Sequence, residues 1–279
     1  MDLEQSCLKK IVLLALAEDR VEADVTTRAL LAFDRPVRAE VRAKATGVIS
    51  GTGVFEKTMK TVDPKLKVTI AKADGSSVLP NDLVLEILGR ESSILKGERT
   101  ALNFLQRLSG IATLTRRYVE KLRPFRTVLL DTRKTTPGMR YLEKRAVRDG
   151  GGSNHRLNLE EMAMVKDNHI AMAGGIGPAV QSVRAAWPGK KLEVEVGTIK
   201  ELEEALALGV EMVMLDNFPI DQVQRAVVLN RGRSKLEISG NVTLENLAEK
   251  AASGVDFISV GALTHSFQSL DISLDIARS

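Results

Sequence analysis

The sequence predicts an α/β protein in which an N-terminal α+β domain precedes an αβ-barrel that is open or irregular. Three observations support this fold class. The first part contains short stretches of alternating apolar and polar residues, which is typical of half-buried antiparallel strands. From Arg126 onward, short apolar runs alternate with helical patterns, which is typical of parallel strands joined by right-handed crossovers. In this second part, charged or small polar residues follow each apolar run, as expected where strands end at the rim of a barrel.

The N-terminal elements are predicted from periodicity and from the glycines that punctuate the turns. The stretch Leu3–Leu16 is amphipathic and predicts a helix. Apolar residues recur at helical spacing from Ile94 to Leu108, and a second helix is expected to follow through Leu122. The strands expected in the largely antiparallel sheet are Pro36–Ala43, Leu66–Ile70 and Leu83–Leu88.

The second part predicts a parallel sheet, because its strands are short, apolar and separated by helices. The expected strands are Thr127–Asp131, Met162–Lys166, Leu192–Val196, Met212–Asp216, Leu236–Ser239 and Phe257–Gly261. The expected helices between the last four are Ile199–Leu208, Ile220–Leu229 and Leu244–Ala252. This set is too small for a regular eightfold barrel, so an incomplete or irregular one is expected.

Composition argues against several classes of partner. The net charge is only +4, and two Tyr and one Trp offer few stacking surfaces, so no nucleic-acid partner is expected. No apolar run approaches the roughly 20 residues of a membrane span, and no signal-peptide pattern opens the chain. The single cysteine, Cys7, cannot form an internal disulfide, which favours a reducing, cytoplasmic setting.

The predicted strand ends carry the candidate active-site residues. In chain order they present Arg133 and Lys134, Lys166, Glu195, Asp216, Ser239 and Gly240, and Gly261. Loops at the carboxyl ends of barrel strands converge on one axis, and active sites are built there. With the Asn154-His155-Arg156 group, the cations indicate a ligand that carries several anionic groups, since a guanidinium binds carboxylate or phosphate through two parallel hydrogen bonds.

Two carboxylates at neighbouring strand ends suggest contacts with sugar hydroxyls or with Mg²⁺, which prefers oxygen ligands. Glu195 and Asp216 fill these positions, and Glu193 shares the side of its strand with Glu195. A structural ion pair is the alternative for each of these carboxylates. Ser239-Gly240-Asn241 precedes Thr243, a good N-cap, and predicts a phosphate pocket at a helix start. The segment from Gly261 to Thr264 repeats this pattern.

Other readings of the same residues stay open at this point. Arg140, Lys144, Arg145 and Arg148 follow helical spacing and form either part of the anion site or a solvated helix face. Lys166 at a strand end also fits a Schiff-base aldolase, and the whole rim fits a phosphate-ligand binder without catalysis. His155 and His169 lack the spacing of a zinc site, and no dinucleotide fingerprint, Walker loop or nucleophile elbow occurs.

With these motifs in order, the chain resembles the quinolinate phosphoribosyltransferase family of NAD biosynthesis. The motifs are Glu98-Arg-Thr-Ala-Leu-Asn-Phe-Leu-Gln-Arg-Leu-Ser-Gly-Ile-Ala-Thr113, Asp131-Thr-Arg-Lys-Thr-Thr-Pro-Gly138, Gly150-Gly-Gly-Ser-Asn-His-Arg156, Val165-Lys-Asp-Asn-His169, Leu192-Glu-Val-Glu-Val196, Met214-Leu-Asp-Asn217, Ser239-Gly240 and Ile258-Ser-Val-Gly-Ala-Leu-Thr264. The resemblance spans nearly the whole chain. One departure is Ala23, where the family usually has glycine before Asp24.

The resemblance implies an N-terminal α/β sandwich over residues 1–110 and a barrel over residues 111–279 whose last segment returns toward the first domain. It implies a decarboxylating phosphoribosyltransferase that converts quinolinate and phosphoribosyl pyrophosphate to nicotinate mononucleotide, pyrophosphate and CO2, with Mg²⁺ as cofactor. It also implies a homodimer, sometimes assembled further, with shared active sites in which Arg99 reaches the partner's quinolinate. A phosphoribosyltransferase of the same fold that acts on another acceptor, such as nicotinate or a molybdenum-associated compound, is the nearest alternative.

The resemblance also assigns roles to the rim residues. Arg133, His155, Arg156 and Lys166 match the two ring carboxylates, and Lys134 assists them or meets the pyrophosphate. Glu195 and Asp216 match the ribose hydroxyls and Mg²⁺, while Ser239, Gly240 and Gly261 match the 5′-phosphate. The expected catalytic residues are Lys134, Lys166, Glu195 and Asp216, and the substrate-binding set further includes Thr132, Asn241, Val260 and Ala262.

Overall fold

The computed structural model describes residues 3–277, which belong to two compact units. The first unit contains the chain up to residue 116, residues 135–151 and the chain from residue 263, and the second contains residues 117–134 and 152–262. The predicted boundary between residues 110 and 111 falls inside one helix, α4 (Glu91–Leu122). The chain passes between the two units more than once, and its last segment, from residue 263, belongs to the first unit.

The first unit is built on an antiparallel sheet, as the alternating sequence pattern predicts. Its strand order is β12-β1-β5-β3, and each neighbouring pair is antiparallel. The strands are β1 (Pro36–Ala43), β3 (Lys67–Ile70), β5 (Leu83–Arg90) and β12 (Ile272–Ile276), and β2 (Gly47–Val48) pairs with β4 (Ser77–Val78) separately. The three predicted strands are confirmed, whereas β12 comes from the far end of the chain and was not predicted.

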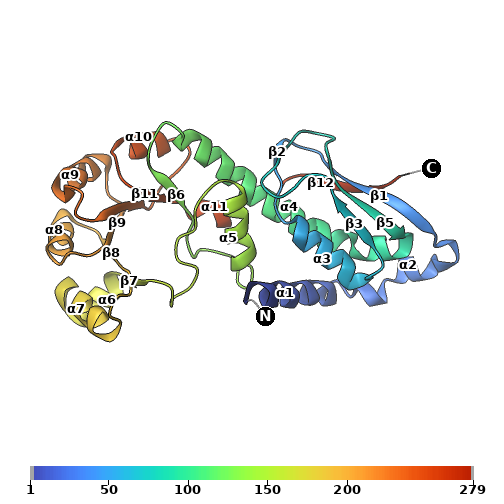
Figure 1. Cartoon of the computed structure of the whole chain (residues 1–279), viewed down its shortest axis with the longest axis horizontal. Helices are drawn as coiled ribbons and strands as arrows, with labels where there is room; N and C mark the ends of the chain where they lie inside the picture. Colours follow the sequence, from blue (N-terminus) through green and yellow to red (C-terminus); the bar gives the residue numbers. More distant parts are fainter. Residues whose placement is uncertain (1–2, 278–279) are drawn as a thin grey trace. The chain divides into compact units, whose positions relative to one another are not determined.

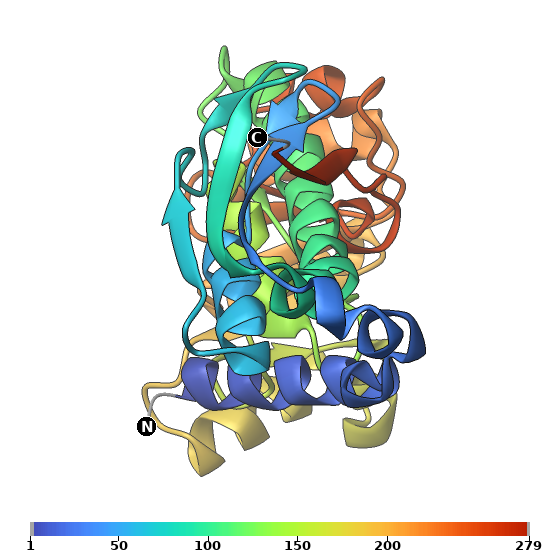
Figure 2. The ribbon, with the colours of Figure 1, turned by 90° about the vertical axis from the view of Figure 1, so that its right-hand side faces the viewer.

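Helices cover one side of this sheet and complete the core of the first unit. Figure 2 shows α4 behind strands β1 and β5. The buried cluster contains Val41 and Ile87 from the sheet, Phe55 from α3, and Ile94 and Leu105 from α4. Burying each such side chain contributes about 1.5–3 kcal/mol, so this cluster is a main source of stability. The helices of the unit are α1 (Leu3–Glu18), α2 (Val25–Ala29), α3 (Thr52–Val62), α4 and α5 (Arg140–Asp149), with 3-10 turns at Val21–Ala23 and Leu31–Phe33.

Helix α4 runs for 32 residues without interruption, so the prediction of two successive helices was wrong. The apolar spacing continues through Leu108 and Ile111, both buried, and nothing breaks the backbone between them. Glycine is required at position 110 because the backbone of Gln268 packs against it, and a Cβ would lie 2.2 Å from the Gln268 carbonyl oxygen. The segment that leads to β12 therefore crosses directly against this helix.

Helix α5 has a buried face that carries charge. Glu143 and Lys144 are almost completely buried, and Arg107 forms an ion pair with Glu143 at 2.7 Å. The interpretation of Lys144 as part of a solvated face was therefore wrong. Arg145 fits that interpretation better, since it is about half exposed and lies 3.4 Å from Asp74.

The second unit contains a parallel sheet with helices on its outer side (Figure 1). Its strand order is β6-β11-β10-β9-β8-β7. The strands are β6 (Val128–Leu130), β7 (Ala163–Val165), β8 (Leu192–Val196), β9 (Met212–Asp216), β10 (Lys235–Ser239) and β11 (Phe257–Ser259). The helices are α6 (Asp167–Ala173), α7 (Ile176–Ala186), α8 (Ile199–Ala207), α9 (Ile220–Asn230) and α10 (Leu247–Ala252). Helix α11 (Ala262–His265) follows β11, and all of it except Ala262 belongs to the first unit. The predicted parallel strands are confirmed, most within one or two residues of their ends.

The sheet remains open along one seam, because β6 and β7 stand at its two ends in the strand order. The segment that begins at Ser153 lies alongside β6, and Leu130 and Ser153 form a parallel bridge there. The expectation of an incomplete barrel is confirmed by this arrangement.

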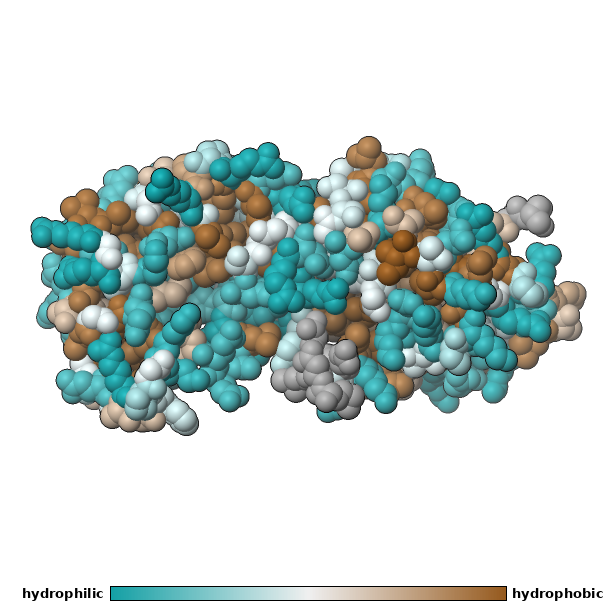
Figure 3. Space-filling model, viewed as in Figure 1, coloured by the Kyte–Doolittle hydropathy of each residue, from teal (hydrophilic) through white to brown (hydrophobic). Residues whose placement is uncertain are grey.

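Hydrophilic residues are spread over both units on the face shown in Figure 3. Among residues 3–277, no helix combines the length and the apolar character that crossing a membrane requires.

Candidate active site

The two faces of the parallel sheet differ in polarity, and this difference creates the site. Along a strand, successive side chains point to opposite faces. One set of positions is apolar and buried, and the register pairs Val194 with Val213, Leu215 with Ile238, and Ile238 with Ile258. The alternate positions are largely polar and include Glu193, Glu195, Asp216, Glu237, Ser239 and Ser259. The apolar set faces the covering helices, and the polar set lies inside the open barrel.

The carboxyl ends of the strands bring the predicted rim residues to one edge of the sheet. Lys166 directly follows β7, Glu195 is the residue before the last one of β8, and Asp216 and Ser239 end β9 and β10. Asp216 and Ser239 are partners in the register of the two strands. Because all six strands are parallel, residues that are far apart in the sequence meet at this edge.

Lys166 and Glu195 form an ion pair across the ends of β7 and β8. The Lys166 side chain is 39% exposed and that of Glu195 is 17% exposed, so the pair is open to a ligand. The backbone N–H of Lys166 donates to Nδ1 of His169 at 3.1 Å. His169 therefore caps the start of α6, which gives this histidine a structural use.

Asparagine side chains hold the turn after β10. The amide of Asn217 donates to Asp216 at 2.9 Å, and the amide of Asn241 donates to Oδ1 of Asn217 at 3.0 Å. Gly240 has φ of 90°, and a Cβ on it would lie 2.1 Å from Oδ1 of Asn217. The backbone of Asn241 also lies in the left-handed region, with φ of 48°. The backbone of this turn is thus held close to Asn217, which allows only glycine at position 240.

The helix predicted to start at Leu244 begins later, at Leu247, so that part of the prediction was wrong. The Asn246 side chain accepts a hydrogen bond from the N–H of Thr243 at 2.9 Å and donates to the carbonyl of Asn241 at 2.8 Å. These bonds stabilise a turn over the residues in which a first helical turn was expected. Backbone amides near position 240 therefore belong to this turn, which separates them from the start of α10.

Asp131 fixes the segment that carries His155 and Arg156. Its carboxylate is completely buried at the end of β6, and it accepts hydrogen bonds from Asn154 Nδ2 at 2.6 Å and from the N–H of His155 at 2.8 Å. The N–H of Asp131 donates to the carbonyl of Ser153 at 3.1 Å. A buried carboxylate that accepts such bonds locks the local backbone, because breaking them leaves a buried charge without partners.

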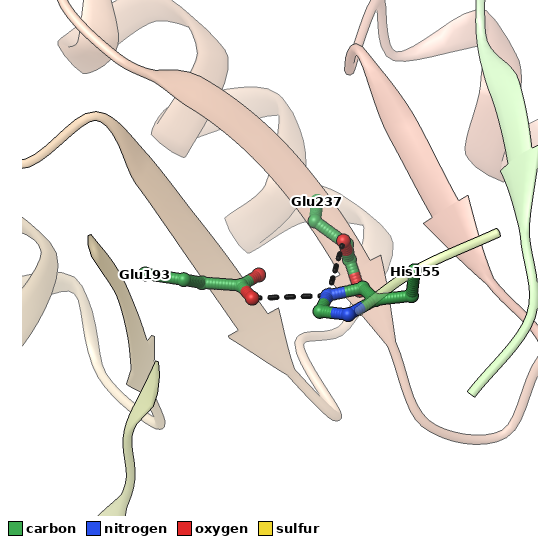
Figure 4. Close-up of side chains that lie close together, drawn as sticks. All are labelled: His155, Glu193 and Glu237. Carbon is green, nitrogen blue, oxygen red and sulfur yellow. Dashed lines mark hydrogen bonds and ion pairs between the residues drawn. The ribbon is translucent and has the colours of Figure 1, made fainter. Parts of the chain in front are cut away.

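Below the rim lies a buried cluster of His155, Glu193 and Glu237 (Figure 4). The His155 Nε2 atom is 3.0 Å from Glu193 Oε2 and 3.5 Å from Glu237 Oε2. Both glutamates have 0% exposure, and Ser259 donates a short hydrogen bond to Glu237. Burial, and then the negative charge of Glu193, raises the pKa of Glu237 from 4.5 to about 8.

The hydrogen bonds of His155 define its protonation. Its Nδ1 accepts the N–H of Arg156 at 2.8 Å and therefore carries no proton. Nε2 then carries the proton and donates it to Glu193. His155 is neutral in this arrangement, which differs from its interpretation as one of the cations.

Arg156 is buried beside this cluster. Its guanidinium donates to the carbonyl of Met162 at 3.0 Å and lies 3.5 Å from Met164 Sδ. Burial, and then the charge of Arg133, lowers the pKa of Arg156, while Glu193 acts in the opposite direction. Two neighbouring guanidinium groups with one nearby carboxylate leave a net positive region, which suits an anionic ligand.

The remaining predicted residues lie in three places. Arg99 is on α4 in the first unit, and the other predicted site residues belong to the second unit. Thr132 accepts a hydrogen bond from the N–H of Lys134 at 3.1 Å, which shapes the turn after β6. Val260 donates its N–H to the carbonyl of Leu130 at 2.9 Å, and Gly261 and Ala262 follow it at the start of α11.

Sequence reasoning missed Glu237, Ser259, Asn217 and a role for Asp131. The alternation in Leu236-Glu237-Ile238-Ser239 was the available signal for Glu237, because it places Glu237 and Ser239 on the same face. A glutamate in the middle of a buried strand is costly unless it is protonated or paired, so it indicates a built network. Together, fold and site define a barrel protein whose candidate site, at the carboxyl ends of parallel strands, suits a small, multiply anionic ligand.

Comparison with known proteins identifies the family. The model of the quinolinate phosphoribosyl transferase C-terminal domain matches residues 111–275, and the model of the N-terminal domain matches residues 24–109. The chain belongs to the quinolinate phosphoribosyltransferase family, which confirms the resemblance found in its motifs.

Individual relatives agree with this assignment. The probable nicotinate-nucleotide pyrophosphorylase [carboxylating] of Bacillus subtilis is 41% identical over 98% of this chain and 94% of its own length. The chloroplastic nicotinate-nucleotide pyrophosphorylase [carboxylating] of Arabidopsis thaliana is 44% identical over 96% of this chain and 82% of its own. Among solved structures, NadC from Streptococcus pyogenes has a TM-score of 0.93 at 41% identity and covers 100% of both chains.

Proposed function

We propose that this chain catalyses the transfer of the phosphoribosyl group to quinolinate, with loss of CO2, in the de novo synthesis of NAD. The substrates are quinolinate and phosphoribosyl pyrophosphate, and the products are nicotinate mononucleotide, pyrophosphate and CO2. Family membership and the near-complete coverage by carboxylating relatives support this reaction.

The observation that carries the proposal is the order of chemical groups around the open barrel. Three cations belong to the seam: Arg133 follows β6, Lys166 follows β7, and Arg156 lies on the segment beside β6 with its guanidinium at the carbonyl of Met162, just before β7. Carboxylates stand at the ends of β8 and β9, and the glycine turn follows β10. This order matches a ligand with carboxylates at one end, a ribose in the middle and a phosphate at the other end.

The seam accounts for the choice of a dicarboxylate acceptor. Arg156 is buried, and a buried guanidinium needs an anionic partner beyond the carbonyl of Met162 and the sulfur of Met164. With Arg133 and Lys166 it offers positive charge for two ring carboxylates, whereas nicotinate has only one. Lys134 follows Arg133 and is exposed, which supports a role toward the pyrophosphate.

Glu195 and Asp216 accept hydrogen bonds from the ribose hydroxyls in this arrangement. Their carboxylates also favour the positive charge that develops at the anomeric carbon as pyrophosphate leaves. Their oxygens fit Mg²⁺, and because Lys166 already neutralises Glu195, they would hold a cation that arrives with the pyrophosphate. Bound Mg²⁺ would offset the negative charge of the leaving pyrophosphate.

The bond changes require no protein nucleophile. The pyridine nitrogen attacks the anomeric carbon while the bond to pyrophosphate breaks with its electron pair. The positively charged ring nitrogen then withdraws electrons from C2. The bond to the 2-carboxylate breaks, CO2 leaves, and C2 takes a proton from solvent. The protein positions the two substrates, and its seam cations hold the ring while its carboxylates face the ribose.

The Schiff-base reading of Lys166 loses support from the ion pair with Glu195. A lysine that attacks a carbonyl needs an uncharged amine, whereas a carboxylate at hydrogen-bond distance favours the ammonium ion. Borohydride treatment with substrate should therefore leave no covalent adduct on this lysine.

The assembly and cellular location are also proposals. A homodimer with shared sites would bring Arg99 of one protomer to the quinolinate of the other, as the family resemblance implies. A cytoplasmic location fits the single, partly buried Cys7, which has no disulfide partner.

One assay tests the function. Purified protein with phosphoribosyl pyrophosphate, Mg²⁺ and quinolinate labelled at the 2-carboxyl should release labelled CO2, and omission of any component should stop the release. Nicotinate in place of quinolinate is the matched control. Consumption of nicotinate with quinolinate inert would reject the assignment.

A further inference from the structure

We propose that Glu193 and Glu237 are positioning residues: Glu193 fixes the proton of His155 on Nε2, which leaves Nδ1 to hold the backbone from which Arg156 reaches the ligand, and Glu237 limits the negative charge beside the ring. This inference deepens the proposed function, on which it rests, by naming residues that act on the quinolinate end of the site without touching the substrate.

The imidazole ring of His155 makes a hydrogen bond at each of its two nitrogens. Glu193 accepts from Nε2 at 3.0 Å, so the proton stays on that nitrogen. Nδ1 is then left with a lone pair, which accepts the N–H of Arg156 at 2.8 Å. If the proton moved to Nδ1, two N–H groups would face each other, and the 155–156 backbone would have to shift.

The backbone of this segment is held from both directions. Asp131 accepts the N–H of His155 at 2.8 Å from the β6 side, while Nδ1 of His155 accepts the next N–H along the chain. The guanidinium of Arg156 is tied to the carbonyl of Met162 before β7. Glu193 therefore acts on Arg156 through His155, and a small rotation of the ring would displace the guanidinium.

Glu237 has a second role, which is to limit the negative charge of the buried cluster. Two ionised glutamates at 0% exposure beside a neutral ring would place two negative charges in the barrel interior. With Glu237 protonated, the cluster carries one charge, on Glu193. The groups that face Glu237 are Glu193 from β8, His155, Ser259 from β11 and Lys166 from the end of β7. Keeping one charge leaves the neighbouring guanidinium groups free to attract the dicarboxylate.

A bound metal ion is the competing explanation, because one atom from each of the three residues lies within 4.8 Å of the others. A metal on Nε2 would need a lone pair there, however, while Nδ1 already accepts a hydrogen bond. Both nitrogens would then lack a proton, and the ring would be an imidazolate. The hydrogen-bond pattern therefore favours the network over the metal.

The decisive experiment compares Glu193→Gln with Glu193→Leu. The glutamine carbonyl can still accept the Nε2 proton, whereas leucine offers no acceptor at a similar volume. We expect Glu193→Leu to raise KM for quinolinate about 10- to 100-fold, as for loss of a buried hydrogen-bond partner, with a much smaller change in KM for phosphoribosyl pyrophosphate. Glu193→Gln should lie closer to the wild type. Equal changes in both KM values, or an unchanged KM for quinolinate in folded Glu193→Leu, would overturn the proposal.

A second readout does not depend on turnover. The chain has three histidines, so ¹⁵N NMR of histidine-labelled protein, with His169→Gln and His265→Gln for assignment, reports the protonation of His155. We expect a neutral ring protonated on Nε2 at neutral pH in the wild type. A doubly protonated ring, or one equivalent of divalent metal that co-purifies with the wild type and is lost from Glu237→Gln, would refute the network. If quinolinate is not consumed, the proposed function fails, and the NMR result still decides the state of His155.

Discussion

Replacing Glu237 with glutamine should change how the stability of the protein depends on pH. Glu237 is completely buried, and burial together with Glu193 raises its pKa from 4.5 to about 8. In the unfolded chain this carboxyl ionises above its ordinary pKa, whereas in the folded protein it keeps its proton until about pH 8. Folding stability is therefore highest below pH 4.5 with respect to this group, falls as the pH rises, and levels off above about pH 8.

The size of the effect follows from the pKa change. Each pKa unit corresponds to about 1.4 kcal/mol, so the full interval from 4.5 to about 8 corresponds to a loss on the order of 5 kcal/mol. Glutamine has the same shape, can accept the hydrogen bond from Ser259 and does not ionise. The stability of Glu237→Gln relative to the wild type should therefore grow by a few kcal/mol as the pH rises through this interval.

Urea unfolding at one protein concentration, repeated across the same pH interval, measures this difference. Glu211→Gln is the matched control, because Glu211 is exposed to solvent just before β9. The control should follow the wild type at every pH. A stability difference for Glu237→Gln that stays constant with pH would show that Glu237 is already ionised in the folded protein, and the single-charge cluster would be refuted.

Two further predictions concern the assembly and the turn after β10. If active sites are shared, mixing an Arg99→Ala subunit with a Lys166→Ala subunit should restore activity in heterodimers, and no recovery after confirmed subunit exchange would contradict the sharing. Gly240→Ala should raise KM for phosphoribosyl pyrophosphate at least tenfold, since a Cβ would lie 2.1 Å from Asn217 and φ is 90°. Gly232→Ala is its control, because Gly232 also has positive φ, at 73°, but its Cβ would meet no atom within 4 Å. It should cost only about 1 kcal/mol of stability and leave both KM values unchanged, and equal kinetic effects of the two variants would rule out the contact with Asn217.

Much of the fold was predictable because local patterns define it. The strand Leu192–Val196 was predicted with its observed bounds, since glutamates that alternate with Leu and Val before a helical pattern leave few alternatives. Rim residues such as Glu195 and Asp216 could be predicted to meet, because parallel strands place their carboxyl ends at one edge. The roles of these residues toward substrate stay predictions.

Features that depend on distant contacts were not predictable from the sequence alone. Glu193 and His155 are 38 positions apart, and nothing local shows that their side chains meet inside the barrel. Gly110 lies inside α4, and glycine is needed there because the backbone at Gln268 crosses the helix too closely for a Cβ. The start of α10 moved because Asn246 hydrogen-bonds to Thr243 and Asn241. In the first two cases a contact between residues distant in the sequence decides the structure, whereas local side-chain hydrogen bonds set the start of α10.

The pairing of β12 with β1 has a consequence for how the protein is made. Five residues of β12 align with Ala39–Ala43, so the sheet of the first unit gains its outer strand only after residue 276 has been synthesised. During translation the edge of β1 that pairs with β12 remains unpaired while the whole barrel sequence is added. An unpaired strand edge can associate with other chains. A ribosome that stops after the barrel would release a chain with an exposed edge. Synthesis of the two units as separate polypeptides would therefore require both the last segment and residues 135–151 to be joined to the N-terminal part of the chain.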